Sequence, residues 1–182
     1  IDAGMSVRPI LITSDDGRAE ISHLAPGTYC IREVKTLPGY VLDETVHEFT
    51  VGEDGLIDGK EVGVRVFENT RTKLIGTTAV SADTGAHEGV PGREVTIIDM
   101  VAFEDLQPGE EYTVKGTLMD AETGKEYLVD EKPVTAETRF VPETKDGSVD
   151  VVFTFDGSGL VGRKVVVFEK AFVCGVEILS HE

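Results

Sequence analysis

The sequence predicts an all-β protein whose antiparallel strands form sandwiches with little helix. Turn signals rich in Gly, Asp and Pro recur along the chain, among them "SDDG", "LPGY", "GEDG", "ETGK" and "FDGSG". Short alternating or β-branched stretches run between these turns, and almost none of the chain has helical periodicity. Short strands separated by frequent turns are typical of β-sandwiches.

The expected strands divide between two domains. We predict strands over residues 7–13, 18–23, 27–34, 45–51, 61–68, 74–80, 94–103, 111–119, 126–136, 148–155, 163–170 and 175–181. The strand "VGVRVFEN" stops before a short polar segment, and a new alternating strand starts at Leu74. We therefore expect one domain over residues 1–72 and another over 73–182, joined by a short, fairly stiff linker.

Composition excludes several classes of partner. The chain has 17 Lys+Arg against 34 Asp+Glu, a net charge of -17, which repels nucleic acid and anionic lipid. No apolar run approaches the roughly 18 residues of a membrane span. The absence of an initiator Met suggests a fragment or a processed product. We expect Cys30 and Cys174 to be free thiols, with a single disulfide as the alternative, and no motif indicates a cofactor or a metal.

One predicted strand places a carboxyl among core residues. In "EVTIIDMVAF", alternation puts Val95, Ile97, Asp99, Val101 and Phe103 on one face. An ionised Asp in a dry interior costs several kcal/mol unless it is paired, hydrogen-bonded or neutralised. Asp99 therefore needs a partner.

Three other polar side chains fall on apolar faces of the same half. Thr77 alternates with Ile75 and Ala79, Glu169 follows apolar positions of "RKVVVFEK", and His181 ends the last predicted strand. Singly, each is more often an ordinary buried Thr or a solvated strand-end residue. Together, a hydroxyl, an imidazole and two carboxyls are the groups that acyl transfer needs. Two carboxyls in a dry site share a proton, so Asp99 is expected to be neutral and to donate a hydrogen bond.

Residues 73–182 resemble the ester-bond-forming domains of Gram-positive adhesins, also called VaFE repeats. The resemblance runs through "IGTTAV", "IIDMVAFEDLQPGEEYTVKGTLMDAETGK", "FVPETKDGSVDVVFTFDGSGLVGRKVVVFE" and the final "HE". It implies that Thr77 is the nucleophile, Asp99 and Glu169 the proton-sharing acids, and His181 the base. Thr78 is the poorer candidate because alternation turns it away from the face of Ile75 and Ala79. The Gln that such a Thr attacks lies beyond the His, and Gln107 does not fit as its substitute. We expect an unreacted site, or one completed in trans by a Gln-bearing strand or peptide.

The first half resembles the Cna protein B-type (Cna-B) domains, which gives two tandem immunoglobulin-like or Cna-B-like sandwiches. The matching positions are Leu24, Gly27, Tyr29, Ile31, Glu33, Pro38, Gly39, Tyr40 and Asn69. In that family a first-strand Lys bonds covalently to the Asn, and the Glu assists. Because no Lys precedes Lys35 here, Glu33 and Asn69 mark an isopeptide site whose Lys is missing.

These resemblances imply a structural stalk segment of a cell-wall-anchored Gram-positive adhesin, located outside the cell. Its partners would be the neighbouring repeat domains of the same protein, and its cross-linking would be a single-turnover self-modification, not enzymatic turnover. A ligand-binding adhesin module and a Thr/His/acid hydrolase using Thr77 and His181 are the alternatives. The acidic turns "TSDDG" and "GEDGLIDGKE" lack EF-hand spacing, which favours solvated hairpins over calcium sites.

Overall fold

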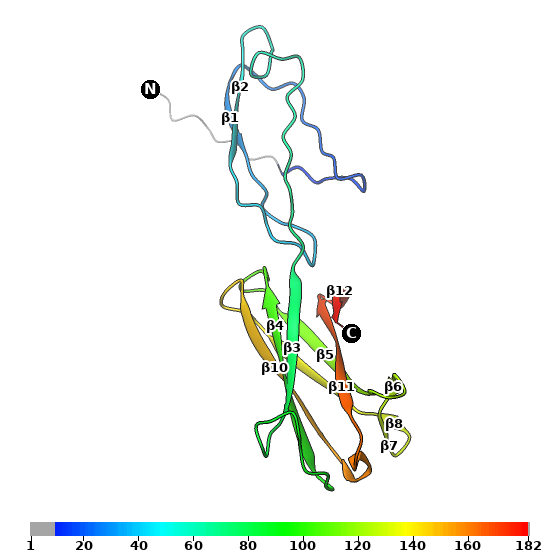
Figure 1. Ribbon diagram of the computed structural model, residues 1–182. Helices are drawn as coiled ribbons and strands as arrows, with labels where there is room; N and C mark the ends of the chain where they lie inside the picture. The colour runs from blue at the N-terminus through cyan, green and yellow to red at the C-terminus, as the bar shows by residue number, and fades with distance from the viewer. Residues whose placement is uncertain (1–9, 182) are drawn as a thin grey trace. The chain divides into compact units, whose positions relative to one another are not determined.

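The computed structural model describes residues 10–181, except for the side chain of Ile75. The chain forms two compact units (Figure 1). The first comprises the residues up to Arg32 together with Thr45–Val66, and the second comprises Glu33–Glu44 together with the chain from Phe67 onward. Strands are the main regular structure, and the described residues contain only one short 3-10 helix, Ser158–Leu160. The prediction of an all-β protein with little helix is confirmed.

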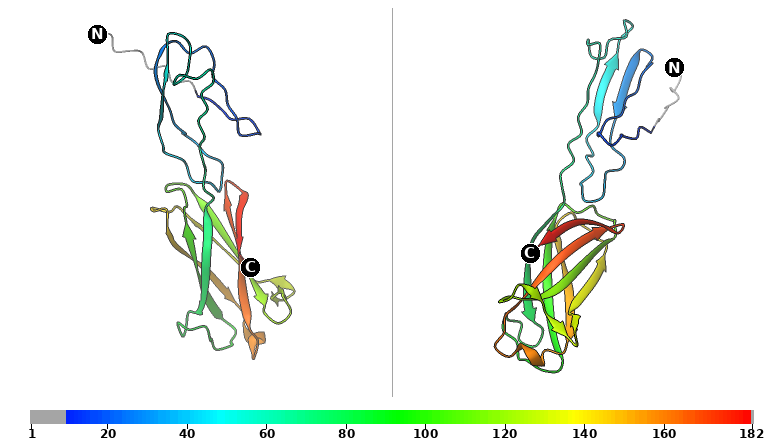
Figure 2. Two further views of the ribbon diagram at one scale, coloured as in Figure 1. Left: turned by 45° about the horizontal axis from the view of Figure 1, so that its top comes forward. Right: turned by 90° about the vertical axis from the view of Figure 1, so that its right-hand side faces the viewer.

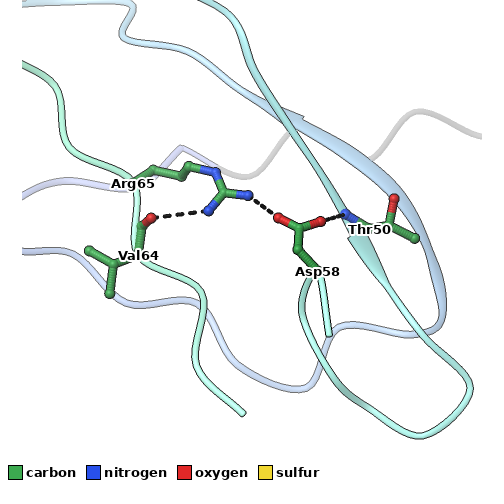
Figure 3. A network of polar contacts seen from close by, with 4 residues as sticks. All are labelled: Thr50, Asp58, Val64 and Arg65. Carbon is green, nitrogen blue, oxygen red and sulfur yellow. Dashed lines mark hydrogen bonds and ion pairs between the residues drawn. The ribbon is translucent and has the colours of Figure 1, made fainter. Parts of the chain in front are cut away.

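The first unit contains one antiparallel pair of strands, β1 (Gly27–Ile31) and β2 (His47–Val51). Tyr29 lies opposite Phe49, and the two rings stack with their centroids 5.5 Å apart. A polar network supports the following loop (Figure 3). In it, the Asp58 carboxylate accepts a hydrogen bond from the Thr50 amide at 2.8 Å and pairs with Arg65. The Thr50 amide, and next Arg65, lower the pKa of Asp58.

Two predicted strands of this half are wrong, namely 18–23 and 61–68, and residues 10–13 of the strand predicted over 7–13 are not a strand either. Residues 7–9 lie outside the described part. The alternation of Val62, Val64 and Val66 is real, but all three side chains are exposed. Alternation shows which residues share a face, whereas a strand also needs a neighbour for its backbone hydrogen bonds. The described residues provide no such neighbour here.

The second unit is built around two principal sheets whose inner faces share one core (Figure 2). The smaller sheet has the order β10-β4-β3, and the larger has the order β12-β11-β5-β6, with β9 also paired to β5. Their strands are β3 (Lys73–Ser81), β4 (Val95–Glu104), β5 (Tyr112–Asp120), β6 (Lys125–Glu126), β9 (Thr135–Phe140), β10 (Gly147–Phe155), β11 (Val165–Val173) and β12 (Val176–His181). Except for β6 and β9, each is close to a predicted strand.

The prediction of one continuous strand over 126–136 is wrong. This stretch contains the end of β6, a small hairpin of β7 (Leu128–Val129) and β8 (Lys132–Pro133), and the start of β9. Asp130 and Glu131 join β7 to β8 with φ of 50° and 63°. Two consecutive residues in the left-handed region reverse the chain tightly, as in hairpin turns. The polar segment "VDEK" was the sequence signal for this turn.

The core fills the space between these two sheets. Its fully buried members come from both sheets and include Val101, Val114, Leu118, Val151 and Phe153. A smaller cluster of Phe103, Leu106, Tyr112 and Val173 closes one end. Inward positions alternate along the central strands, as the sequence predicted for β4. This packing creates the dry environment in which Asp99 lies.

Two further predictions concern chemistry outside the core. Cys30 and Cys174 are free and exposed, which confirms the expected free thiols. Residues 10–181 include no helix that is long and apolar enough to cross a membrane.

Candidate functional site

Asp99 lies in the middle of β4, the central strand of the smaller sheet. It is 0% exposed, with Val151 of β10 opposite it on one side and Ala79 of β3 on the other. Neither carboxyl oxygen has a hydrogen-bond partner that donates to it within the described residues. Asp99 is thus a fully dehydrated acid between two apolar neighbours.

Glu169 occupies the matching position in the larger sheet. It lies on β11 and is 1% exposed, opposite Gly116 of β5 and His181 of β12. Both of its carboxyl oxygens also lack a donor in the part of the chain that the structure describes. Each of the two sheets therefore buries one acid, and the described residues offer neither acid a backbone N–H or a hydroxyl donor.

The two carboxyls meet across the core. Burial is the largest cause that raises the pKa of Glu169 to about 9, followed by a hydrogen bond with the Asp99 side chain and by the Asp99 charge. Two ionised carboxylates only accept hydrogen bonds, so a bond between them requires a proton. The pair therefore holds a proton at neutral pH.

The sequence analysis expected this proton on Asp99. In the structure burial and the neighbouring Asp99 raise the pKa of Glu169, and the proton belongs to the pair of carboxyls.

Thr77 faces the same interior. It lies on β3 opposite Val101 and is half-buried, whereas Thr78 lies opposite Met100 and is exposed. A bulge between Leu74 and Gly76 interrupts the alternation that the sequence analysis drew through Ile75. The regular register resumes after the bulge, so Thr77 remains on the face of Asp99. Its hydroxyl has no hydrogen bond within the described residues.

His181 reaches the site from the other open edge. It lies opposite Glu169 in the β11–β12 pair, and directly opposed residues project to the same face of a sheet. β12 and β3 are edge strands of different sheets, yet they approach each other closely. The fold thus places Thr77, Asp99, Glu169 and His181 on four strands whose inner faces border the shared core.

Sequence reasoning missed Gly116, which lies opposite Glu169 and leaves room for the Phe153 ring. A Cβ at Gly116, opposite Glu169, would lie 2.5 Å from Phe153 Cζ and 3.3 Å from Val167 Cγ1. Phe153 is itself buried and takes up the space that a side chain at 116 would need. The available signal was the Gly in the middle of "YTVKGTLMD", because an interior strand Gly often marks a close approach.

Glu33 and Asn69 form a second, smaller polar site. Asn69 Nδ2 donates to Glu33 Oε1 at 2.9 Å, and the Asp43 amide donates to Glu33 Oε2 at 2.8 Å. Asn69 Oδ1 is buried and accepts no hydrogen bond from the described residues. The structure therefore brings together the two residues that the Cna-B resemblance selected, and it leaves the carboxamide oxygen available to a further donor.

The acidic turns hold their own backbone instead of gathering around an ion. Asp16 accepts hydrogen bonds from the Ser14 hydroxyl at 2.5 Å and the Arg18 amide at 3.2 Å. The Ser14 hydroxyl is the main cause that lowers the pKa of Asp16. Across residues 10–181, no three His, Cys, Asp or Glu side chains are grouped as a metal site would require.

Two solved structures with a weak likeness to this chain are of bacterial surface proteins. One is an adhesin from Mobiluncus mulieris containing intramolecular disulfide, isopeptide and ester bond cross-links, 17% identical, with a TM-score of 0.41 over 55% of this chain and 44% of that one. Another is a variant of BcpA, the major pilin subunit of Bacillus cereus, 15% identical, with a TM-score of 0.28 over 98% of this chain and 58% of that one. This chain thus spans about half the length of either. No curated protein matches it as a relative.

Two family models match the sequence. The model of a prealbumin-like fold domain, SpaA, matches residues 5–63. The model of the T-Q ester bond containing domain matches residues 73–182, which include all four interior polar residues described above. That match covers more than half of the chain. The chain therefore belongs to the family of T-Q ester bond containing domains.

Proposed function

We propose that the chain is a stalk segment of a Gram-positive cell-surface adhesin or pilus, in which a domain at 73–182 cross-links itself through an ester between Thr77 and a Gln side chain. A Cna-B-like domain over 1–72 would precede it, and neighbouring repeats of the same surface protein would flank both. The observation that carries this proposal is the pair of fully buried acids in the core that Thr77 also faces, with no backbone or hydroxyl donor to either among residues 10–181.

In the proposed reaction, the Thr77 oxygen attacks the side-chain amide carbon of the Gln. His181 takes the hydroxyl proton and passes it to the departing nitrogen, so that a C–O bond forms, a C–N bond breaks and ammonia leaves. The protonated member of the Asp99–Glu169 pair donates a hydrogen bond to the amide oxygen as negative charge develops there. Holding the two groups together can supply roughly 7–11 kcal/mol in favourable intramolecular cases.

The dry site also preserves the product. An ester exposed to water would hydrolyse, and the core that buries Asp99 and Glu169 excludes water from the bond. The cross-link would join β3 to a strand beyond β12 and would close a loop of about 100 residues. By analogy with disulfides, this contributes on the order of 5 kcal/mol. Resistance to pulling and to proteolysis is the expected benefit for a stalk.

The burial favours self-modification over turnover. A hydrolase would need a cleft that admits its substrate, whereas Asp99 and Glu169 are 0% and 1% exposed. Each domain would react once. The Gln would come from a strand outside residues 1–182 or from another molecule, because Gln107 lies in the β4–β5 loop and not on an edge strand beside Thr77.

The Glu33–Asn69 site is proposed as the corresponding isopeptide site. Asn69 is held by Glu33, and a Lys side chain supplied from outside this sequence would attack the Asn69 carboxamide carbon with loss of ammonia. Glu33 would carry the proton between the two nitrogen atoms. This reaction would be independent of the ester.

The test is to incubate the chain with a synthetic peptide that continues the last strand and carries a single Gln. Intact mass spectrometry is expected to show a covalent adduct lighter than the sum of the two masses by one ammonia, and hydroxylamine should cleave it as it cleaves esters. The control peptide replaces Gln with a residue that has no carboxamide and should give no adduct. A folded chain that gains no mass with the Gln peptide would refute the ester proposal.

A further inference from the structure

The turn "LPGY", residues 37–40, is hydrogen-bonded to the segment that leads into β3. The Gly39 carbonyl accepts hydrogen bonds from the Thr72 amide at 3.0 Å and from the Thr72 hydroxyl at 3.2 Å. Tyr40 forms a β-bridge with Arg71, whose Nε donates to the Tyr40 hydroxyl at 3.1 Å while its guanidinium lies 5.5 Å from the ring centroid. Thr72 is 1% exposed. These contacts fix the turn directly before the strand that carries Thr77.

The same turn lies against β12. A Cβ built on Gly39 would lie 2.9 Å from Ile178 Cγ2 and 3.0 Å from Ile178 Cβ, so no side chain fits between the turn and the strand. Gly39 also has a φ of +81°, which side chains rarely adopt. Ile178 packs against both buried clusters of the sandwich. The backbone of the turn therefore covers the outer end of a core residue on the strand that carries His181.

β3 and β12 have no shared ladder of hydrogen bonds to set their spacing. They are edge strands of two different sheets, although they approach each other. Within the described residues, the 37–40 turn contacts both the residues that enter β3 and a residue of β12. A rigid turn that touches both edges can hold them at a fixed distance. Thr77 lies five residues beyond Thr72, and His181 lies three beyond Ile178.

We propose that the 37–40 turn is a clamp that sets the spacing of β3 and β12, and that Gly39 is a positioning residue for the reaction between these strands. The clamp is a property of the fold, whereas its catalytic consequence depends on the proposed ester chemistry. It makes the sandwich dependent on a segment that precedes the 73–182 match. A chain lacking residues 33–44 would retain all four reactive groups but not their spacing.

The first test compares Gly39→Val with Gly109→Val in the full chain. Gly109 has a φ of +82° and nothing within 4 Å of a built Cβ, so it matches the backbone strain without the contact. Hydrogen exchange of the β12 amides is expected to be about tenfold faster in the Gly39 variant than in the Gly109 variant, the usual scale of an overpacking effect. The His181 ring resonance should shift only in the Gly39 variant. Equal exchange and equal resonances in the two variants would overturn the clamp.

A milder substitution tests the clamp with less risk that the variant fails to fold. Tyr40→Phe removes the acceptor of the Arg71 hydrogen bond and leaves Gly39 in place, so β12 exchange should rise in the same direction by a smaller factor. Circular dichroism would establish that each variant keeps its strands. If Tyr40→Phe leaves β12 exchange unchanged while Gly39→Val accelerates it, the contact with Ile178 carries the clamp; if neither changes it, the clamp is refuted.

The second test measures the rate of adduct formation with the Gln peptide at saturation. Gly39→Val is expected to react about tenfold more slowly than Gly109→Val. Equal rates would refute the positioning role. If the unaltered chain forms no adduct, the ester proposal fails, but the exchange and resonance measurements still decide whether the clamp exists.

Discussion

The carboxyls of Glu169 and Glu33 illustrate two ways of placing an acid beside apolar strand residues. Glu169 is 1% exposed, and its carboxyl shares a proton with that of Asp99. Glu33 is half-buried, and each of its oxygens accepts a hydrogen bond, one from Asn69 and one from the Asp43 amide. A shared proton stabilises the first acid, and hydrogen bonds from N–H groups stabilise the second.

This difference follows from the amount of core around each acid. Asp99 and Glu169 lie between two sheets that share one core, whereas Glu33 and Asn69 lie outside the strands, on segments of the second unit that precede β3, and both are only partly buried. A thick apolar layer removes both water and donors, so the charged form of a carboxyl is unfavourable. Chemistry that needs a protonated acid at neutral pH is therefore expected in the sandwich.

The largest effect is expected from removing the Thr77 hydroxyl, which tests whether the ester forms on the inner face of the sandwich. Thr77→Val removes the hydroxyl while keeping the shape, and it should abolish adduct formation with the Gln peptide. Thr78→Val is the matched control, because Thr78 is exposed and points away from Asp99. Intact mass spectrometry measures the amount of adduct formed by each variant. Persistent adduct in the Thr77 variant would move the nucleophile elsewhere.

The second largest effect on adduct formation is expected from replacing Glu169, a member of the proton-sharing pair. Glu169→Gln keeps a hydrogen-bond donor but removes the titratable proton, and we expect adduct formation to slow by roughly 10²–10³-fold, the scale of losing one preorganised group in acyl transfer. Glu33→Gln should leave the rate within a few fold. The comparison between the two acids would be wrong if both variants reacted equally slowly.

The third prediction concerns stability against pH in the unreacted chain. The pKa of Glu169 is raised from 4.5 to about 9, so between these pH values the folded chain holds a proton that the unfolded chain has released. The free energy of unfolding therefore falls as pH rises through this window, with a limiting slope of about 1.4 kcal/mol per pH unit. Urea unfolding at several pH values measures this slope.

Glu169→Gln is the control for that slope, because it removes the titrating group. In this variant the dependence on pH between about 4.5 and 9 should flatten. Asp120 and Glu137 do not obscure the window, since their pKa values are lowered and their contribution is lost only on acidification. An unchanged slope in the variant would show that another group is responsible.

The smallest expected effect is at the half-buried acid. Glu33→Ala removes the acceptor of both the Asn69 side chain and the Asp43 amide, and it should destabilise the chain by about 1–3 kcal/mol. Because Glu33 is partly exposed, water should replace part of the loss and keep the value near the lower end. Urea unfolding at neutral pH is the measurement. A larger loss than that of a core truncation such as Phe153→Ala, expected at about 3–5 kcal/mol, would reverse our ranking of the two sites.

The strands of the sandwich were largely predictable, and so were β1 and β2, whereas the strands predicted over 18–23 and 61–68 do not form. In β4, β5 and β10, alternation coincides with a partner on each side, so pattern and pairing agree. At 61–68 the same alternation occurs without a partner, and the chain is not a strand. The bulge beside Gly76 and the hairpin at Asp130 were also not foreseen, because each depends on a local shift of register that a regular alternation does not contain.

The sequence by itself determined which polar side chains share a face with the core. Alternation was sufficient to put Asp99, Glu169 and Thr77 inward and Thr78 outward, because side-chain direction in a strand is a local property of the backbone. Only the tertiary structure decided that Asp99 and Glu169 meet and that Gly39 lies against Ile178. Each of these depends on distances between segments far apart in the chain, which are set by how the sheets and turns pack.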